Sequence, residues 1–150
     1  MSSGVDPAAL RSARENAGLT QHELARLIGA AGGERVSRWE LGMSEPRPDF
    51  FVKLARILHI PALRLVHFEG EIPDLRALRL KAGLTGPELA SRANLSVPTY
   101  LRWEAGRWAR LPSPVIVEAL ARAVEEPVDV VVDGFGEARR LRVLRAQLDT

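Results

Sequence analysis

The amino-acid sequence predicts an all-α protein made of two similar helical bundles in tandem, followed by a short C-terminal helix. Two observations support this fold class. The chain of 150 residues repeats itself with a period of about 65 residues. Each copy also carries helix start and stop signals in the same order. The sheet content is expected to be nil or nearly so.

The repeat consists of blocks that keep their order along the chain. Leu10–Ala25 reads LRSARENAGLTQHELA and Leu75–Ala90 reads LRALRLKAGLTGPELA, so more than half of the aligned positions match. The triplet RWE that begins at Arg38 returns at Arg102, and the proline at Pro61 returns as Pro127. Duplication explains this similarity, but it does not by itself indicate a function.

The first copy is expected to form four short helices. The first helix ends at Gly18, because glycine is a common helix stop. Thr20 and Glu23 form a capping box that opens the second helix. The third helix carries Trp39, and the fourth begins near Pro48, where a missing N–H costs little.

The second copy repeats these signals. Thr85 and Glu88 form its capping box, its third helix carries Trp103, and its fourth begins near Pro114. The segment Val128–Val132 is rich in β-branched residues, so it could be extended rather than helical.

The segments outside the two copies are short. His67–Pro73 is expected to be a linker, because it contains both glycine and proline. Asp133–Gly136 is expected to break the chain, and Glu137–Leu148 to form the C-terminal helix with a leucine stripe. The expected domains are 1–69, 70–135 and 136–150.

The composition excludes several classes of protein. There is no cysteine, so disulfides, thiolate metal ligands and thiol nucleophiles are absent, which suits a reducing cytoplasm. No secretory signal or membrane-spanning segment is visible. His22, His59 and His67 lack ligand spacing, and no catalytic constellation, P-loop or dinucleotide fingerprint occurs. We therefore expect no enzyme, no metal site and no cofactor.

The charge is compatible with a nucleic-acid partner without requiring one. The net charge is only +2, although the sequence pI is near 9.6. Nearly all cations are arginines, which suit phosphate and guanine recognition. The same bias towards Arg and Ala could equally come from a GC-rich coding sequence.

The chain carries the pattern LRxxRxxAGLTQxELA … RWExG … RPxxxxxxLARxLxIP. This pattern resembles that of the Cro/CI repressor-like helix-turn-helix family, also called the xenobiotic-response-element type. Both copies carry it, and together they cover nearly all of residues 8–133. The resemblance implies two lambda-repressor-like bundles. In each one the third helix lies in the DNA major groove, and the start of the second contacts the backbone. It also implies a cytoplasmic, sequence-specific transcriptional regulator that acts as a repressor.

Carried over position by position, the resemblance gives two groups of candidate DNA-binding residues. In the first copy they are Thr20, Gln21, Gly33, Glu34, Arg35, Ser37, Arg38 and Arg47. In the second copy they are Ser96, Val97, Thr99 and Arg102. Arg107 and Arg110, in a segment where the second copy has two extra residues, are added for their charge as candidate phosphate contacts.

The two copies depart from the family pattern in opposite ways. The first has one extra residue in its glycine-rich turn, Gly29–Gly33, which predicts a late start of the third helix. The second has Gly86 in place of Gln21, and Val97 and Pro98 cannot make bidentate base contacts. We therefore expect the first copy to be the main base reader.

Several side chains outside these groups are also expected to have structural or binding roles. Trp39 and Trp103 are expected to be core anchors, and Glu40 and Glu104 to brace the loop after the third helix. Trp108 could be a surface wedge or could fold back onto the core. The arginines of the C-terminal helix could support dimerisation, docking onto the second copy or phosphate contact.

Two functions remain open at this point. The leading hypothesis is a DNA-binding regulator that acts either as a built-in pseudo-dimer on an asymmetric site or as a homodimer on a palindrome. Dimerisation would use the second unit or the C-terminal helix. The alternative is an antitoxin-like or adaptor protein whose second unit binds a protein partner.

Overall fold

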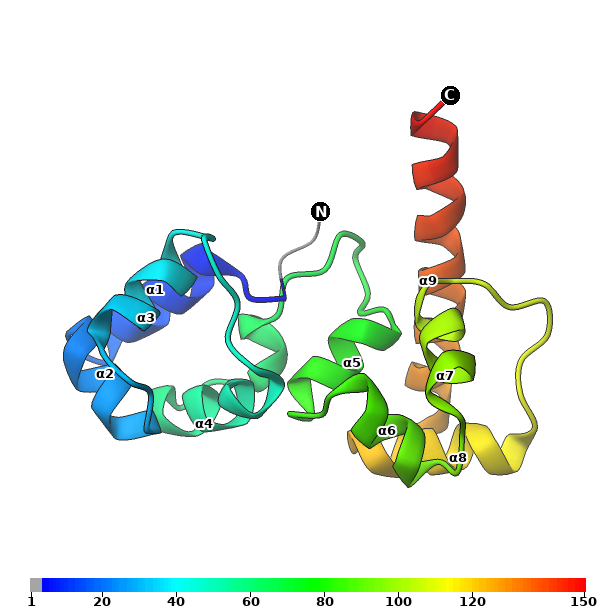
Figure 1. Ribbon diagram of the computed structural model, residues 1–150, viewed down its shortest axis with the longest axis horizontal. Coiled ribbons are helices and arrows are strands. Elements are labelled where there is room, and N and C mark those ends of the chain that lie inside the picture. Colours follow the sequence, from blue (N-terminus) through cyan, green and yellow to red (C-terminus); the bar gives the residue numbers. More distant parts are fainter. Residues whose placement is uncertain (1–3) are drawn as a thin grey trace.

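A computed structural model describes residues 4–150, and in this range the fold is all-α, as expected. Figure 1 shows two helical bundles side by side, with a long helix rising beyond the second. The elements are α1 (Pro7–Asn16), α2 (Gln21–Ile28), α3 (Gly33–Glu40), α4 (Pro48–Leu58), the 3₁₀ helix η1 (Ala62–Leu65), α5 (Leu75–Lys81), α6 (Gly86–Arg92), α7 (Val97–Glu104), α8 (Pro114–Val124) and α9 (Val128–Leu148). The β-bridge in the described residues is an isolated pair, Val5 with Val66.

We call α1–η1 the first unit and α5–α9 the second unit. Both predicted capping boxes are present. The Thr20 hydroxyl accepts a hydrogen bond from the Glu23 amide at 3.0 Å, and the Thr85 hydroxyl accepts one from the Glu88 amide at 3.2 Å. In each box the glutamate side chain accepts the N-cap amide in return. The second helix of each unit is thus fixed at its start by local sequence.

Each unit has its own hydrophobic core. Trp39 is 2% exposed in the first core and stacks at a tilt on Phe50, with ring centroids 5.5 Å apart. Trp103 packs against the second core, where its ring partner is Phe135 of α9 at 5.7 Å. The expectation that both tryptophans anchor a core is confirmed, although their aromatic partners come from different elements.

The helix α5 belongs to both cores and joins the two units (Figure 1). Its Ala77 and Leu80 lie in the first core, and Leu75 and Leu78 lie in the second. Outside the core, Arg76 forms an ion pair with Glu45 at 3.4 Å. The first helix of one unit therefore packs on the α4–η1 end of the other, in a head-to-tail arrangement.

Helix α9 corrects one expectation from the sequence. The chain does not break at Asp133–Gly136, and Val128–Val132 is not extended: one helix runs from Val128 to Leu148. The cost of the two interior glycines is offset because Val131, Phe135, Ala138 and Leu141 are buried along one side. A boundary at residue 136 consequently falls inside this helix.

The first half of α9 occupies the position that η1 has in the first unit, since each follows the repeated proline, Pro61 or Pro127. Gly134 allows α9 to approach α5 closely, because a Cβ there would lie 3.0 Å from Leu78 Cδ1. The last turns of α9 extend away from the bundle (Figure 1). No helix in the described part of the chain is long and apolar enough to cross a membrane.

Candidate nucleic-acid interface

In the first unit α2 and α3 pack against each other and are joined by a glycine-rich turn. Gly29 ends α2 with a left-handed conformation at φ +76°. Gly33, the first residue of α3, lies so close to α2 that a Cβ would be 3.1 Å from His22 Cα. Gly33 is thus a packing position, where a side chain would push the two helices apart.

The expected late start of α3 is wrong. Gly33 in α3 and Val97 in α7 stand at the same spacing before Trp39 and Trp103, so both helices begin at equivalent positions. The extra residue of the first copy is absorbed in the turn between α2 and α3. The register of the α3 side chains therefore agrees with that of α7.

A hydrogen-bonded network fixes α3 relative to α1 and α2. The Arg14 guanidinium donates to both Glu40 carboxylate oxygens, at 2.6 and 3.0 Å, and to the Leu19 carbonyl at 2.8 Å. The Gln21 amide also donates to Glu40, at 3.1 Å. Only 3% of the Glu40 side chain is exposed, so this carboxylate is held by charge-assisted bonds in a site nearly free of water.

The second unit contains the same brace. Arg79 donates to both oxygens of Glu104 at 2.8 Å and to the Leu84 carbonyl at 3.0 Å. Burial, the largest cause, together with Glu104 raises the pKa of the adjacent Tyr100 hydroxyl. The sequence interpretation of Glu40 and Glu104 was wrong in detail: both hold the third helix to the first helix rather than bracing the following loop.

The outer face of α3 is polar. Glu34, Arg35 and Arg38 are exposed, whereas Val36 and Trp39 point into the core and Ser37 is half-buried. Within residues 4–150 the side chains of Arg35 and Arg38 have no ion pair or hydrogen bond. Two unpaired guanidinium groups on a firmly held helix are suitable donors for base edges and phosphates.

The remaining candidates of the first unit lie at helix starts. Thr20 is the N-cap of α2. The side-chain amide of the next residue, Gln21, donates one hydrogen bond to Glu40, and its carbonyl oxygen can still accept a hydrogen bond. Arg47 is exposed at the start of α4, 3.6 Å from Asp49 and 5.6 Å from the Phe50 ring centroid. Helix starts of this kind attract phosphate oxygens.

The corresponding face of α7 in the second unit is less polar. Ser96 caps the helix, and its hydroxyl donates to the Thr99 hydroxyl at 2.8 Å. Val97 is half-buried against the second core, and Leu101 is 45% exposed on the outer side. Arg102 is the exposed cation of this helix.

Leu101 covers the start of α6. Gly86, at the position equivalent to Gln21, is buried, and a Cβ there would lie 3.0 Å from Leu101 Cδ2. The first unit has Gln21 and Ser37 at the two positions where the second has Gly86 and Leu101. The two changes complement each other, and they replace a polar helix start with an apolar contact.

The loop after α7 is anchored to α9. The Trp108 indole donates to the Phe135 carbonyl at 3.0 Å, and Arg139 lies 3.9 Å over the Trp108 ring. Arg142 donates to the Gly106 carbonyl at 3.2 Å. Trp108 therefore folds back onto the core, and α9 docks onto the second unit.

Two further arginines of α9 are also paired within the chain. Arg140 pairs with Glu137, and Arg145 lies 3.3 Å from Glu69 of the linker. Arg107 and Arg110, in contrast, are exposed in the loop after α7.

The structure thus separates the candidates into two groups with α5 between them. Those of the first unit surround α2 and α3, and those of the second surround α7 and its following loop. The Arg14–Glu40 and Arg79–Glu104 braces were not foreseen, although the repeated LRxxR and RWE blocks carry all four residues. No cluster of potential metal ligands occurs among residues 4–150.

Comparisons with known families agree with this geometry. A family model described as Helix-turn-helix matches residues 10–65, and one described as Helix-turn-helix domain matches residues 74–132. Neither the curated proteins nor the solved structures gave a significant match. Helix-turn-helix domains of this type are found in DNA-binding regulators. The chain therefore belongs to the Cro/CI-type helix-turn-helix proteins, with two such domains in tandem.

Proposed function

We propose that this protein is a cytoplasmic transcriptional repressor that binds double-stranded DNA sequence-specifically and reads bases mainly with α3. The observation that carries the proposal is the outer face of α3, where Arg35 and Arg38 are unpaired within residues 4–150. The Arg14–Glu40–Gln21 network holds that helix in place, so the backbone that carries these arginines does not have to be ordered on binding.

Each group of the first unit has a distinct part in this proposal. Arg38 and Arg35 reach base edges in the major groove, where a bidentate arginine–guanine pair contributes about 1–3 kcal/mol of discrimination. Thr20 and Gln21 at the start of α2, and Arg47 at the start of α4, bind phosphates and set the register. Repression follows from occupancy, because a bound protein excludes others from the same stretch of DNA.

The head-to-tail contact of the two units favours an asymmetric DNA site. In a two-fold pair, equivalent surfaces would meet each other. Here α5 packs on α4 and η1, which are not equivalent to α5. A single chain therefore offers two unlike reading helices without a two-fold axis, and we favour this arrangement over a homodimer on a palindrome.

A second function is supported by the contact between Leu101 and Gly86. It gives the second unit an apolar outer face, and Leu111 in the following loop is 42% exposed. This unit could hold a protein partner, while Arg102, Arg107 and Arg110 could still contact phosphates. The protein would then be an adaptor or antitoxin-like module.

The decisive experiment selects bound duplexes from a random pool and then measures affinity for the selected duplex against salt concentration. The repressor proposal predicts one enriched motif and a steep loss of affinity with salt, since each phosphate contact releases counterions. The mass of the complex gives the number of chains per site. Failure to enrich any duplex would reject DNA reading and leave the adaptor function.

A further inference from the structure

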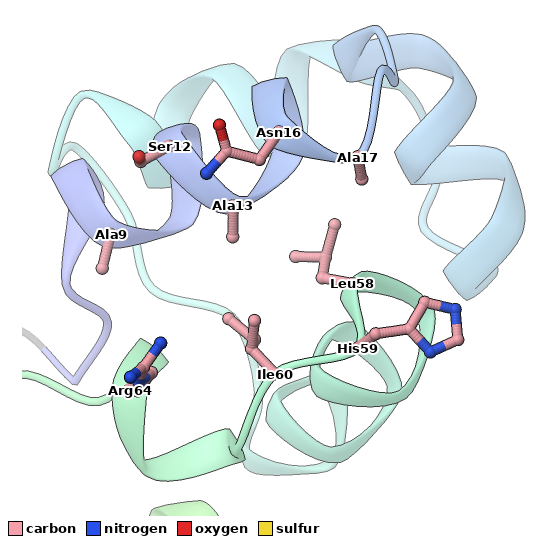
Figure 2. A pocket seen from close by; sticks show the side chains of 9 residues that line it. All are labelled: Ala9, Ser12, Ala13, Asn16, Ala17, Leu58, His59, Ile60 and Arg64. Atoms are coloured by element: carbon pink, nitrogen blue, oxygen red, sulfur yellow. The ribbon is translucent and has the colours of Figure 1, made fainter.

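A groove in the first unit has no part in the proposed DNA contacts. It has a volume of about 490 Å³ and lies between α1 and the segment that joins α4 to η1 (Figure 2). Ala9, Ala13 and Ala17 form the α1 wall, one helical turn apart. Leu58 and Ile60 form the opposite wall. The middle of the groove is therefore apolar and has a size typical of small-ligand sites.

The equivalent space in the second unit is filled. Leu78 stands where the first unit has Ala13, and it is only 1% exposed. One turn further along α5, Lys81 forms an ion pair of 2.9 Å with Glu126, which stands where the first unit has Ile60. The open groove is thus a property of the first unit's own residues and not of the shared bundle.

Two side chains with nitrogen donors stand at the two ends of the groove. Arg64 of η1 lies at one end and His59 at the other (Figure 2). Among the described residues neither side chain has an ion pair or a hydrogen bond. A guanidinium presents a planar set of donors that matches a carboxylate. The charge of this groove therefore complements a small anion with an apolar body.

We propose that the groove binds a small carboxylic acid, with the carboxylate on Arg64 and the apolar chain or ring against the alanine wall. The single guanidinium at the anion end suits a monoanion better than a phosphate group. Ser12 and Asn16 add polar groups to the α1 side of the groove.

The test measures binding of octanoate to the full chain by calorimetry and by NMR shifts. Two control probes are 1-octanol, which lacks the carboxylate, and acetate, which lacks the long apolar chain. Ala13→Leu copies the sister residue Leu78 and should abolish binding. Ala8→Leu places the same side chain on an exposed position of α1 outside the groove and should leave binding unchanged. Arg64→Gln, also at an exposed position, should weaken octanoate by about tenfold and leave 1-octanol unaffected.

Three results would overturn the proposal. One is the absence of saturable octanoate binding at millimolar concentrations. Another is equal binding by the Ala13→Leu and Ala8→Leu proteins. The third is a chain that self-associates through the groove, detected as a dimer in sedimentation that Ala13→Leu dissociates. Because Arg64 is exposed and its replacement does not disturb the core, the Arg64→Gln result stands even if Ala13→Leu folds poorly.

Discussion

At the scale of single residues, the same arginine–glutamate brace stabilises both units, but it serves different surroundings. In the first unit Glu40 also accepts from Gln21, so the brace reaches the start of α2. In the second unit Gly86 has no side chain to contribute, and the Tyr100 ring is buried beside the pair instead. The brace therefore maintains the fold in both units and supports a candidate DNA contact only in the first.

We expect Glu104→Ala to lower the free energy of unfolding by about 3–5 kcal/mol, because Arg79 would be left as a buried, unpaired charge. The Arg79 and Glu104 side chains are only 11% and 10% exposed. Urea denaturation measures the change. Glu118→Ala, on an exposed position of α8, is the control and should stay within about 0.5 kcal/mol. An equal decrease in the free energy of unfolding of the two variants would show that the Arg79–Glu104 pair does not stabilise the fold.

Asp74 gives the fold a predicted pH dependence. Burial, the largest cause, and the nearby Glu104 raise the pKa of this carboxyl, while its hydrogen bond from the Ala77 amide opposes the rise. The folded state therefore binds the proton more tightly than the unfolded state, so stability falls as pH rises through the raised pKa.

Asp74→Asn keeps the N-cap acceptor of α5 and removes the buried charge. We expect this variant to be more stable than the original protein at neutral pH and to lose the downward slope in the pH range above about 4, the usual aspartate pKa. Denaturation midpoints across that range test this. An unchanged slope would contradict the assigned role of Asp74.

At the scale of elements, α9 shows what the sequence could and could not predict. The proline starts of α4 and α8, the capping boxes and the third-helix tryptophans follow from local signals, and each of these was predicted, whereas the start of α3 was not. The continuity of α9 depends instead on tertiary packing. Two glycines oppose a helix locally, but Phe135 and Leu141 are buried by docking on the second core, and sequence periodicity does not reveal that docking.

The places of the candidate residues on the helices were predicted to a similar extent. The positions of Gln21, Arg38 and Arg102 followed from the family pattern, because helix register is local. The packing of Leu101 on Gly86 and of Trp108 on the second core depends on contacts between elements, so neither could be predicted from residue spacing alone.

Replacing the glycines of the second unit tests the continuity of α9. A Cβ at Gly136 would meet nothing within 4 Å, so Gly136→Ala should stabilise the protein by about 1 kcal/mol through helix propensity. Gly106→Ala is the contrasting variant. It has φ +80°, and its Cβ would overlap the Ala138 carbonyl oxygen, so it should destabilise by more than about 1 kcal/mol. A loss of stability in Gly136→Ala would indicate that the helix breaks there.

At the scale of the whole molecule, α5 contributes to the cores of both units, so we expect the two units to unfold as one cooperative body. Leu80 is 5% exposed and lies in the first core, whereas the equivalent residue of the first unit, Glu15, is exposed and pairs with Arg11. The first helix of the first unit, α1, thus lacks the apolar face with which α5 packs on the first unit. We expect this difference to oppose the continuation of head-to-tail packing from one chain to the next.

Leu80→Glu copies the first repeat and should uncouple the two units. We expect a loss of about 2–5 kcal/mol and the separation of one unfolding transition into two, since the interface would bury an unpaired charge. Calorimetry distinguishes one transition from two. The matched control is Leu27→Glu, at a position of α2 that is 53% exposed, and it should unfold in one step. A single transition in both variants would contradict the coupling.

The proposed function depends above all on α3 being the main reader of the DNA sequence. The most direct measurement is a selection from random duplexes with the original protein, Arg38→Ala and Arg102→Ala. We expect Arg102→Ala to enrich the original motif with weaker binding, and Arg38→Ala to lose preference at one or two bases and about 1–3 kcal/mol of affinity. A motif that survives Arg38→Ala and changes with Arg102→Ala would contradict the account.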